Sequence, residues 1–124
     1  MSKTYEKVGK GRFFNETPEN EKQPNFKGKA EIAGKEFDLA IWRRTSKAGS
    51  RYLSVSFSLP GEREQIGNGA LFERDNKNRK APRLTGPAEI GGRNFEMGVW
   101  PQVSEAGNEY FSVKFELVTE TEDE

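Results

Sequence analysis

The sequence predicts an all-β protein made of two tandem four-stranded meander repeats. Residues 11–59 align with residues 69–117 without a gap, and 20 of the 49 aligned pairs are identical. Within each copy, apolar and polar residues alternate, and glycines separate the alternating segments, as is typical of antiparallel strands joined by tight turns. We expect the repeats to pack about a pseudo-twofold axis into one eight-stranded sandwich or partly closed barrel.

Each copy contains segments with the period of a half-buried strand. In the first copy, "EFDLAIW" (36–42) and "YLSVSFSL" (52–59) place every second residue on an apolar face, and the second copy keeps the same parity. A shorter apolar piece, at 11–14 in the first copy and 69–72 in the second, predicts an additional first strand. Because a slip of one residue would invert every face, we expect the register to be firmly set.

Glycines mark the predicted turns. Gly34-Lys35 and Gly92-Arg93 each lie between apolar runs and suit two-residue hairpin loops. "SKAG" (46–49) and "SEAG" (104–107) suit four-residue turns that end in a left-handed glycine.

These signals divide the chain of 124 residues into five segments that form one domain. The expected order is a flexible N-terminal segment (1–10), the first repeat (11–59), a linker (60–68), the second repeat (69–117) and a flexible acidic tail (118–124).

Composition argues against catalysis. The chain has no Cys and no His, which removes thiolate nucleophiles, cysteine zinc sites and the commonest acid–base group. No P-loop, dinucleotide fingerprint or nucleophile elbow is present. We therefore expect a non-enzymatic protein without a cofactor. Without an apolar span or a signal segment, we also expect it to be cytoplasmic and not to bind membranes.

Charge is unevenly distributed although the net charge is zero. Residues 1–60 carry 12 Lys/Arg and 7 Asp/Glu, whereas residues 61–124 carry 8 and 13. The acidic end, "TETEDE", resembles in composition the disordered tails of single-strand binding proteins, and tails of this kind also serve solubility alone.

Strand parity predicts a binding surface on the polar face of the sheet. Aromatic rings at Trp42, Tyr52, Trp100 and Tyr110 are interleaved there with small hydroxyl groups and cations. Bases stack on such rings while cations contact phosphates, so this pattern favours single-stranded nucleic acid. The alternative is that the loops 15–27 and 73–85 cover these rings.

Basic residues in the loops could supply phosphate contacts. The segment "KNRKAPR" contains Lys77, Arg79, Lys80 and Arg83, and the matching region of the first copy contains Lys22, Lys27 and Lys29. Arg43 and Arg44 extend the basic side in the first copy only. The recurring carboxylates Glu31/Glu89 and Asp38/Glu96 lack a metal-binding loop, so we expect a solvated sheet face and no metal site there.

The second copy resembles a group of small, largely uncharacterised bacteriophage and bacterial proteins. The shared pattern runs G-x-L-F, P-x-x-x-G, I-x-G, W, S-K-x-G and Y/F-x-S-V/L, and covers the repeat unit. The resemblance implies a phage or mobile-element origin and a role in DNA metabolism or host interference. It implies no catalytic residues.

We therefore predict a monomeric, internally pseudo-dimeric protein that binds single-stranded nucleic acid, most simply DNA. Further association of the chain is left open. The predicted contacts are Trp42, Arg43, Arg44, Tyr52, Lys77, Arg79, Lys80, Arg83, Trp100 and Tyr110. The main alternative is a phage protein-interaction module, an inhibitor or adaptor of a host protein that could mimic nucleic acid. A third possibility is a small ligand, such as a nucleotide, bound between the halves.

Overall fold

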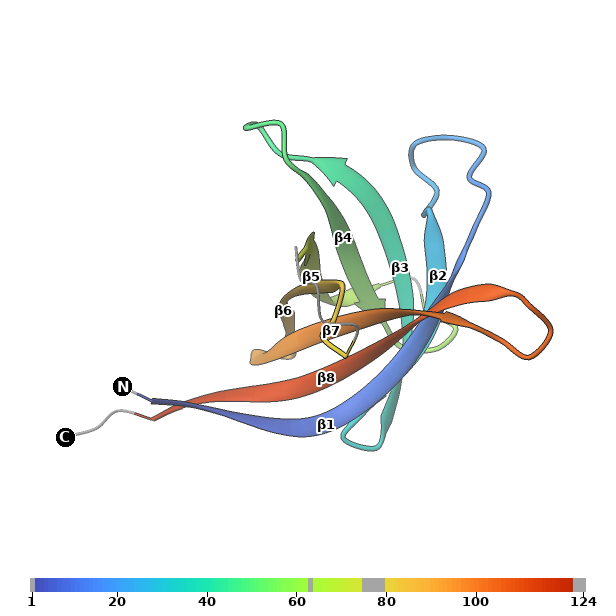
Figure 1. The fold of residues 1–124 in the computed structure, drawn as a ribbon. Helices are drawn as coiled ribbons and strands as arrows, with labels where there is room; N and C mark the ends of the chain where they lie inside the picture. Colours follow the sequence, from blue (N-terminus) through green and yellow to red (C-terminus); the bar gives the residue numbers. More distant parts are fainter. Residues whose placement is uncertain (1, 63, 75–79, 122–124) are drawn as a thin grey trace.

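The chain folds into eight antiparallel strands that close into a barrel (Figure 1). The computed structural model describes residues 2–62, 64–74 and 80–121. The strands are β1 (Ser2–Asn15), β2 (Phe26–Ile32), β3 (Lys35–Thr45), β4 (Arg51–Ser58), β5 (Gln65–Glu73), β6 (Leu84–Ile90), β7 (Arg93–Val103) and β8 (Glu109–Thr121). The predicted all-β meander is confirmed, and of the two expected closures the structure has the barrel. Among the described residues, none forms a helix long and apolar enough to cross a membrane.

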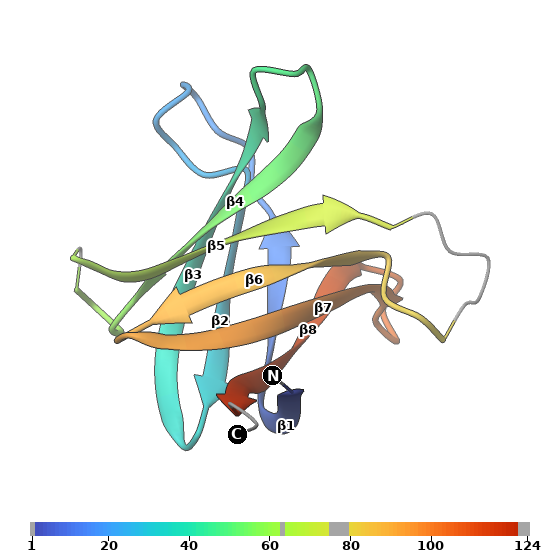
Figure 2. The ribbon, with the colours of Figure 1, turned by 90° about the vertical axis from the view of Figure 1, so that its left-hand side faces the viewer.

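Every strand pairs with its sequence neighbours, and β1 pairs with β8 to complete the ring. Closure leaves no free sheet edge around the barrel body, which removes a common cause of aggregation. The β1–β2, β3–β4, β5–β6 and β7–β8 connections lie at one end, called here the loop end (Figure 2). The β2–β3, β4–β5 and β6–β7 turns lie at the opposite end, called the turn end.

The interior is packed with the apolar residues that alternate along each strand. β3 and β7 show the same burial pattern, in which every second residue from Phe37 and from Phe95 is buried. Phe57 and Phe115 meet edge to face across the core, with ring centroids 5.9 Å apart. The buried residues are Phe13, Phe26, Ala30, Ile32, Phe37, Leu39, Ile41, Val55, Phe57, Leu71, Ala88, Ile90, Phe95, Met97, Val99, Val113 and Phe115.

Glycine permits close approach of neighbouring strands inside the barrel. A Cβ atom at Gly28 would collide with the carbonyl oxygen of Arg12 and the Cα of Phe13. At Gly86 it would collide with the carbonyl oxygen of Ala70. These contacts involve backbone atoms that cannot rotate away, so the tight barrel depends on the absence of a side chain at both positions.

Strand pairing recurs at an interval of 58 residues. The β2–β3 register runs from Phe26 opposite Ile41, and the β6–β7 register runs from Leu84 opposite Val99. Such matching pairs are what the sequence alignment predicts. The pseudo-twofold axis itself stays a prediction.

The two-residue turns lie one position earlier than predicted. β2 ends at Ile32 and β3 begins at Lys35, so the loop residues are Ala33 and Gly34, with φ of 53° and 80°. The β6–β7 loop is Gly91-Gly92, with φ of 59° and 81°. Two successive positive φ values are characteristic of type I′ turns, whose twist matches that of the strands. The predicted left-handed glycines at 49 and 107 are confirmed, each with φ of 85°.

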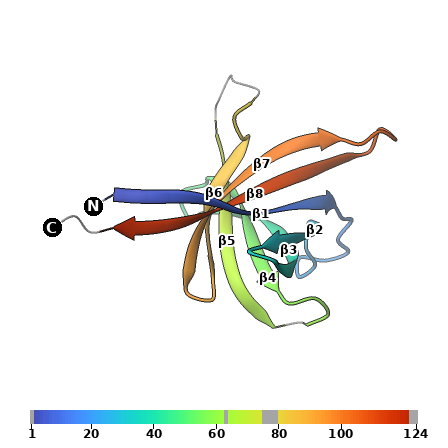
Figure 3. The same cartoon turned by 90° about the horizontal axis from the view of Figure 1, so that it is seen from below.

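Both chain ends are more ordered than expected. Residues 2–10, predicted to be flexible, form the first part of β1, and residues 118–121 of the predicted tail extend β8. Residues 2–5 pair with residues 118–121 in a ribbon that projects from the barrel (Figure 3). Backbone hydrogen bonds across the ribbon order these mostly polar segments. Residues 122–124 of the tail lie outside the described residues. Likewise, residues 65–68 of the predicted linker belong to β5.

Candidate nucleic-acid interface

Apart from Tyr5 on the projecting ribbon, the most exposed aromatic rings of the described residues lie on the outer face of the barrel, where the first and second halves of the chain meet. On the β8–β1 side, Phe14 contacts Tyr110 with ring centroids 5.9 Å apart and planes tilted by 32°. Phe14 is 44 % exposed, because it points away from the core that Phe13 fills. An exposed ring on a rigid strand offers a flat surface on which a base can stack without prior rearrangement.

Five cations lie on the same outer face of β8, β1 and β2 as this aromatic pair. They are Lys10, Arg12, Lys27, Lys29 and Lys114, and all five are exposed. We call these cations together with Phe14 and Tyr110 the basic aromatic face. The guanidinium carbon of Arg12 lies 5.7 Å from the centre of the Tyr110 ring, a cation–π distance.

Strand register explains why these side chains meet. Phe14 lies opposite Lys27 on β2, and Arg12 lies opposite Lys29. Across the other edge of β1, Arg12 lies opposite Ser112 and Lys10 lies opposite Lys114. Lys27 and Lys29 are two positions apart and therefore about 6.6 Å apart along β2 on the same face. Within the part of the chain that the structure describes, no ion pair engages Arg12, Lys27 or Lys29.

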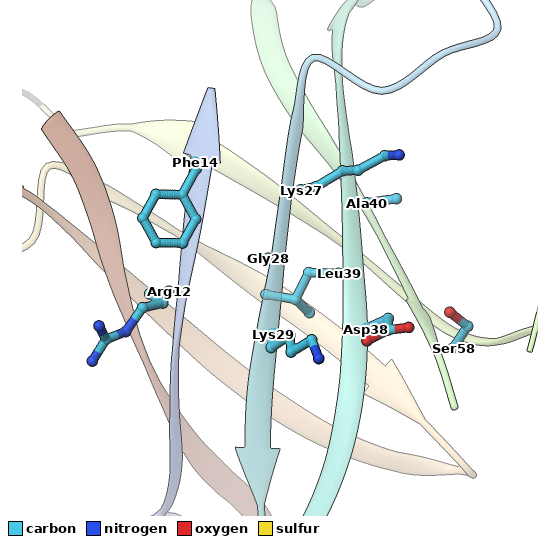
Figure 4. A pocket seen from close by; sticks show the side chains of 9 residues that line it. All are labelled: Arg12, Phe14, Lys27, Gly28, Lys29, Asp38, Leu39, Ala40 and Ser58. Carbon is cyan, nitrogen blue, oxygen red and sulfur yellow. The ribbon is translucent and has the colours of Figure 1, made fainter. Parts of the chain in front are cut away.

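A groove of about 570 Å³ runs over β1, β2 and β3 beside Phe14 (Figure 4). Arg12, Phe14, Lys27 and Lys29 project from the strands on the same side, and the small residues Ala40 and Gly28 also line the groove. The one carboxylate at its rim, Asp38, accepts a hydrogen bond from the backbone N–H of Gly61 at 3.4 Å. Toward the turn end, Glu31 and Glu36 line a neighbouring hollow, so acidic side chains lie beside the groove on that side.

The matching surface on β4, β5 and β6, called here the twin face, has similar aromatics and fewer cations. Tyr52 stacks on Phe72 with centroids 5.8 Å apart, and Phe72 is 41 % exposed. The positions that align with the five cations are Asn68, Ala70, Thr85, Pro87 and Ser56. Two arginines border the twin face: Arg44 lies opposite Tyr52, and the Nε–H of Arg74 donates to Thr85 Oγ1. The halves have therefore diverged in charge around nearly identical ring pairs.

Trp42 and Trp100 are half-buried beneath the loops. The indole N–H of Trp42 donates to the carbonyl oxygen of Lys22 at 3.2 Å, and that of Trp100 donates to the carbonyl oxygen of Lys80 at 3.1 Å. Trp100 also lies against Gly98 and Lys114, whose ammonium is 5.3 Å from the ring centre. The loops thus cover part of both rings, as the alternative interpretation anticipated.

Of the other predicted contact residues, Arg43, Arg44 and Arg83 line one opening at the loop end, away from the basic aromatic face. Arg43 lies on the inner side of β3, and its guanidinium carbon is 5.1 Å from the centre of the Phe26 ring at the loop end. Arg44 lies 5.8 Å from the Trp42 ring centre on the outer side. Arg83 lines the loop-end opening with Arg43. Lys77 and Arg79 lie outside the described residues.

Sequence reasoning missed Arg12 and Phe14 as site residues and assigned Lys27 and Lys29 to a loop. All four lie in strands, and parity would have placed them on the outer face had β1 and β2 been given their full lengths. These residues lie near Tyr110 because β1 pairs with β8, and the alternation of residues within one short segment does not predict which distant strands pair.

The described residues contain no group of three or more His, Cys, Asp or Glu side chains arranged to hold a metal ion. No family model, curated protein or solved structure matches the chain. The resemblance of the repeat to phage and bacterial proteins therefore stays a prediction.

Proposed function

We propose that the protein binds single-stranded nucleic acid on the basic aromatic face and has no catalytic role. The observation that carries this proposal is the set of five exposed cations on the same outer strand faces as the Phe14–Tyr110 pair. A base would stack on Phe14, and Arg12, Lys27 and Lys29 would contact the flanking phosphates. Of the rings expected from sequence, Tyr110 belongs to this surface, whereas Trp42, Trp100 and Tyr52 do not.

The basic aromatic face suits a single strand better than a duplex. Stacking requires an unpaired base, and Phe14 lies on the outer face of a barrel strand that is paired on both sides, which does not enter a duplex groove as a helix or a free ribbon does. Nothing on this surface distinguishes DNA from RNA, so we propose DNA only as the simplest ligand for a first test.

The test compares two matched double variants in fluorescence anisotropy titrations of a labelled dT oligonucleotide. Phe14→Ala/Tyr110→Ala removes the rings of the basic aromatic face and should weaken binding at least about tenfold, since stacking contributes about 1–3 kcal/mol per base. Phe72→Ala/Tyr52→Ala removes the equivalent rings of the twin face and should change affinity less than about twofold. Equal losses in the two variants, or no binding by the wild-type protein, would contradict the proposal.

Salt dependence tests the cations separately. Each phosphate contact contributes about −0.7 to the slope of log K against log salt for a single strand. Lys27→Gln/Lys29→Gln should therefore reduce the magnitude of the slope by roughly 1.4. Arg93→Gln, at the turn end of the barrel, serves as a charge control and should leave the slope unchanged.

A protein-interaction module remains the second candidate, and the twin face favours it. An exposed pair of stacked aromatics with few cations is typical of the centre of a protein interface. Stoichiometric capture of one partner protein that is lost in Phe72→Ala/Tyr52→Ala, together with no oligonucleotide binding, would support this function instead.

A further inference from the structure

The loop end of the barrel contains a pocket of about 460 Å³, distinct from the outer basic aromatic face. Its apolar wall comes from Phe26, Leu53, Leu71, Leu84 and Phe111. Its rim comes from Arg43, Arg44, Arg51 and Arg83, with Thr45, Tyr52 and Glu73. The volume falls within the range of small-ligand sites, which are lined mainly by apolar side chains with a few polar groups that orient the ligand.

The pocket exists because the two halves fill the loop end differently. On the β8–β1–β2 side, Phe13, Phe26 and Phe111 pack as a trio, with centroid distances of 4.9–5.7 Å. The three positions that lie 58 residues away in the alignment are Leu71, Leu84 and Leu53, on β5, β6 and β4. Three phenyl rings on one side are thus matched by three smaller side chains on the other, and the unfilled space is the pocket.

The rim arginines are also not repeated at the aligned positions of the other half. Arg43, Arg44, Arg51 and Arg83 align with Pro101, Gln102, Glu109 and Asn25. All four arginines are exposed, and Arg43 lies over the Phe26 ring at the entrance. Glu73 is the single carboxylate of the lining, so the entrance carries an excess of positive charge.

We propose that this pocket binds a small amphipathic anion, with its alkyl or aryl body against the leucines and its carboxylate or phosphate head among the arginines. The alkyl or aryl body would bury apolar surface against the leucines, as Phe13, Phe26 and Phe111 do against one another on the other side. A carboxylate or phosphate matches the planar donors of arginine, which bind both groups in a bidentate manner. A neutral or cationic amphiphile of the same length would leave the arginines without a partner.

Isothermal titration calorimetry with chemically matched probes tests the proposal. Decanoate and decyl phosphate, each below its micelle-forming concentration, are expected to bind with one molecule per chain and to raise the Tm by about 5 °C near saturation. Decanol, decyltrimethylammonium and inorganic phosphate should bind at least about tenfold more weakly, because each lacks the head or the body. Which of the two anions binds more tightly identifies the preferred head group.

Two sets of variants separate a specific pocket from general detergent binding. Leu53→Phe/Leu84→Phe introduces the residues found at the matching positions and should abolish decanoate binding while leaving oligonucleotide binding unchanged. Arg43→Gln/Arg51→Gln should weaken decanoate at least about tenfold and remove the preference over decanol, whereas Arg93→Gln should do neither. The proposal is overturned if the wild-type protein binds neither anion or binds decanol equally well. It is also overturned if the phenylalanine variant retains binding or, should that variant not fold, if the arginine variant keeps the wild-type preference.

Discussion

At the scale of single residues, one turn carries backbone strain. Ala33 is the only residue other than glycine with positive φ among those the structure describes, and its φ of 53° lies in the left-handed region. Its counterpart in the second half is Gly91, which adopts a φ of 59° without a Cβ. The left-handed region costs an L-residue about 1–2 kcal/mol, so the first hairpin is less favourable than the second.

This strain predicts that Ala33→Asn stabilises the protein. Asn is well tolerated at the first central position of a type I′ turn, and Asn-Gly is the preferred pair. We expect a gain of about 0.5–1 kcal/mol in the free energy of unfolding, measured by chemical denaturation. Gly91→Ala is the matched reverse change and should destabilise the protein by a similar amount, because nothing lies within 4 Å of a Cβ built there and strain alone would act. A loss of stability in Ala33→Asn would contradict this account.

Single residues also show which side-chain positions the alternation of apolar and polar residues could predict and which it could not. Parity correctly placed Ile41 inside and Trp42 outside, because successive side chains of a strand point to opposite faces. The same parity put Arg43 on the inner side, where the strand leaves the packed core and the side chain reaches the loop-end pocket. Sequence reasoning had grouped Arg43 with Arg44 by charge, although the two lie on opposite sides of β3.

At the scale of elements, the tryptophans connect the sheet to its long loops. Each indole N–H donates to a loop carbonyl, and nearby backbone bonds repeat the arrangement: the N–H of Asn25 donates to Ile41 and that of Arg83 donates to Val99, at 2.8 and 2.9 Å. Loops of this length lose much conformational entropy on ordering, and these bonds offset part of that cost.

Trp100→Phe should loosen the β5–β6 loop without unfolding the barrel. The ring volume is largely kept while the hydrogen bond to Lys80 is lost, so stability should fall by about 1 kcal/mol. Hydrogen exchange followed by mass spectrometry should show faster exchange in residues 80–83. The turn at 46–49 is the internal control and should exchange as before. Unchanged exchange at 80–83 would show that the indole does not order the loop.

The strands β1 and β8 are longer than apolar pattern predicts. The apolar pattern detects a strand by its buried face, whereas Lys3, Thr4, Tyr5 and Thr119 of the ribbon are exposed, Tyr5 at 52 %. Its order comes from pairing between segments at opposite ends of the chain, which no local window contains.

At the scale of the whole molecule, two strand pairs, called here seams, join the two halves into one barrel. β4 pairs with β5 and β8 pairs with β1, so each half contributes a strand to both closures. Either half alone would expose two unpaired strand edges and one side of its apolar core.

This arrangement predicts that the halves fold only together. Fragments 1–61 and 62–124, made separately, should give the far-ultraviolet circular dichroism of unfolded chains at micromolar concentration. Mixing them should restore β-sheet signal with a cooperative thermal transition. A fragment that remains a folded monomer by sedimentation would contradict the requirement for both seams, whereas a fragment that folds only as a homodimer would be consistent with it.

The sequence by itself determined the strand count, the repeat and the face on which most side chains lie, because alternation and turn chemistry are local properties of the chain. The tertiary structure alone decided that the strands form a closed barrel and that Phe14 lies beside Tyr110, which is 96 positions away. It also decided that four arginines meet over leucines at one end. The physical reason is that contacts across a closure depend on the register between distant strands, and this register is set by packing of the whole core.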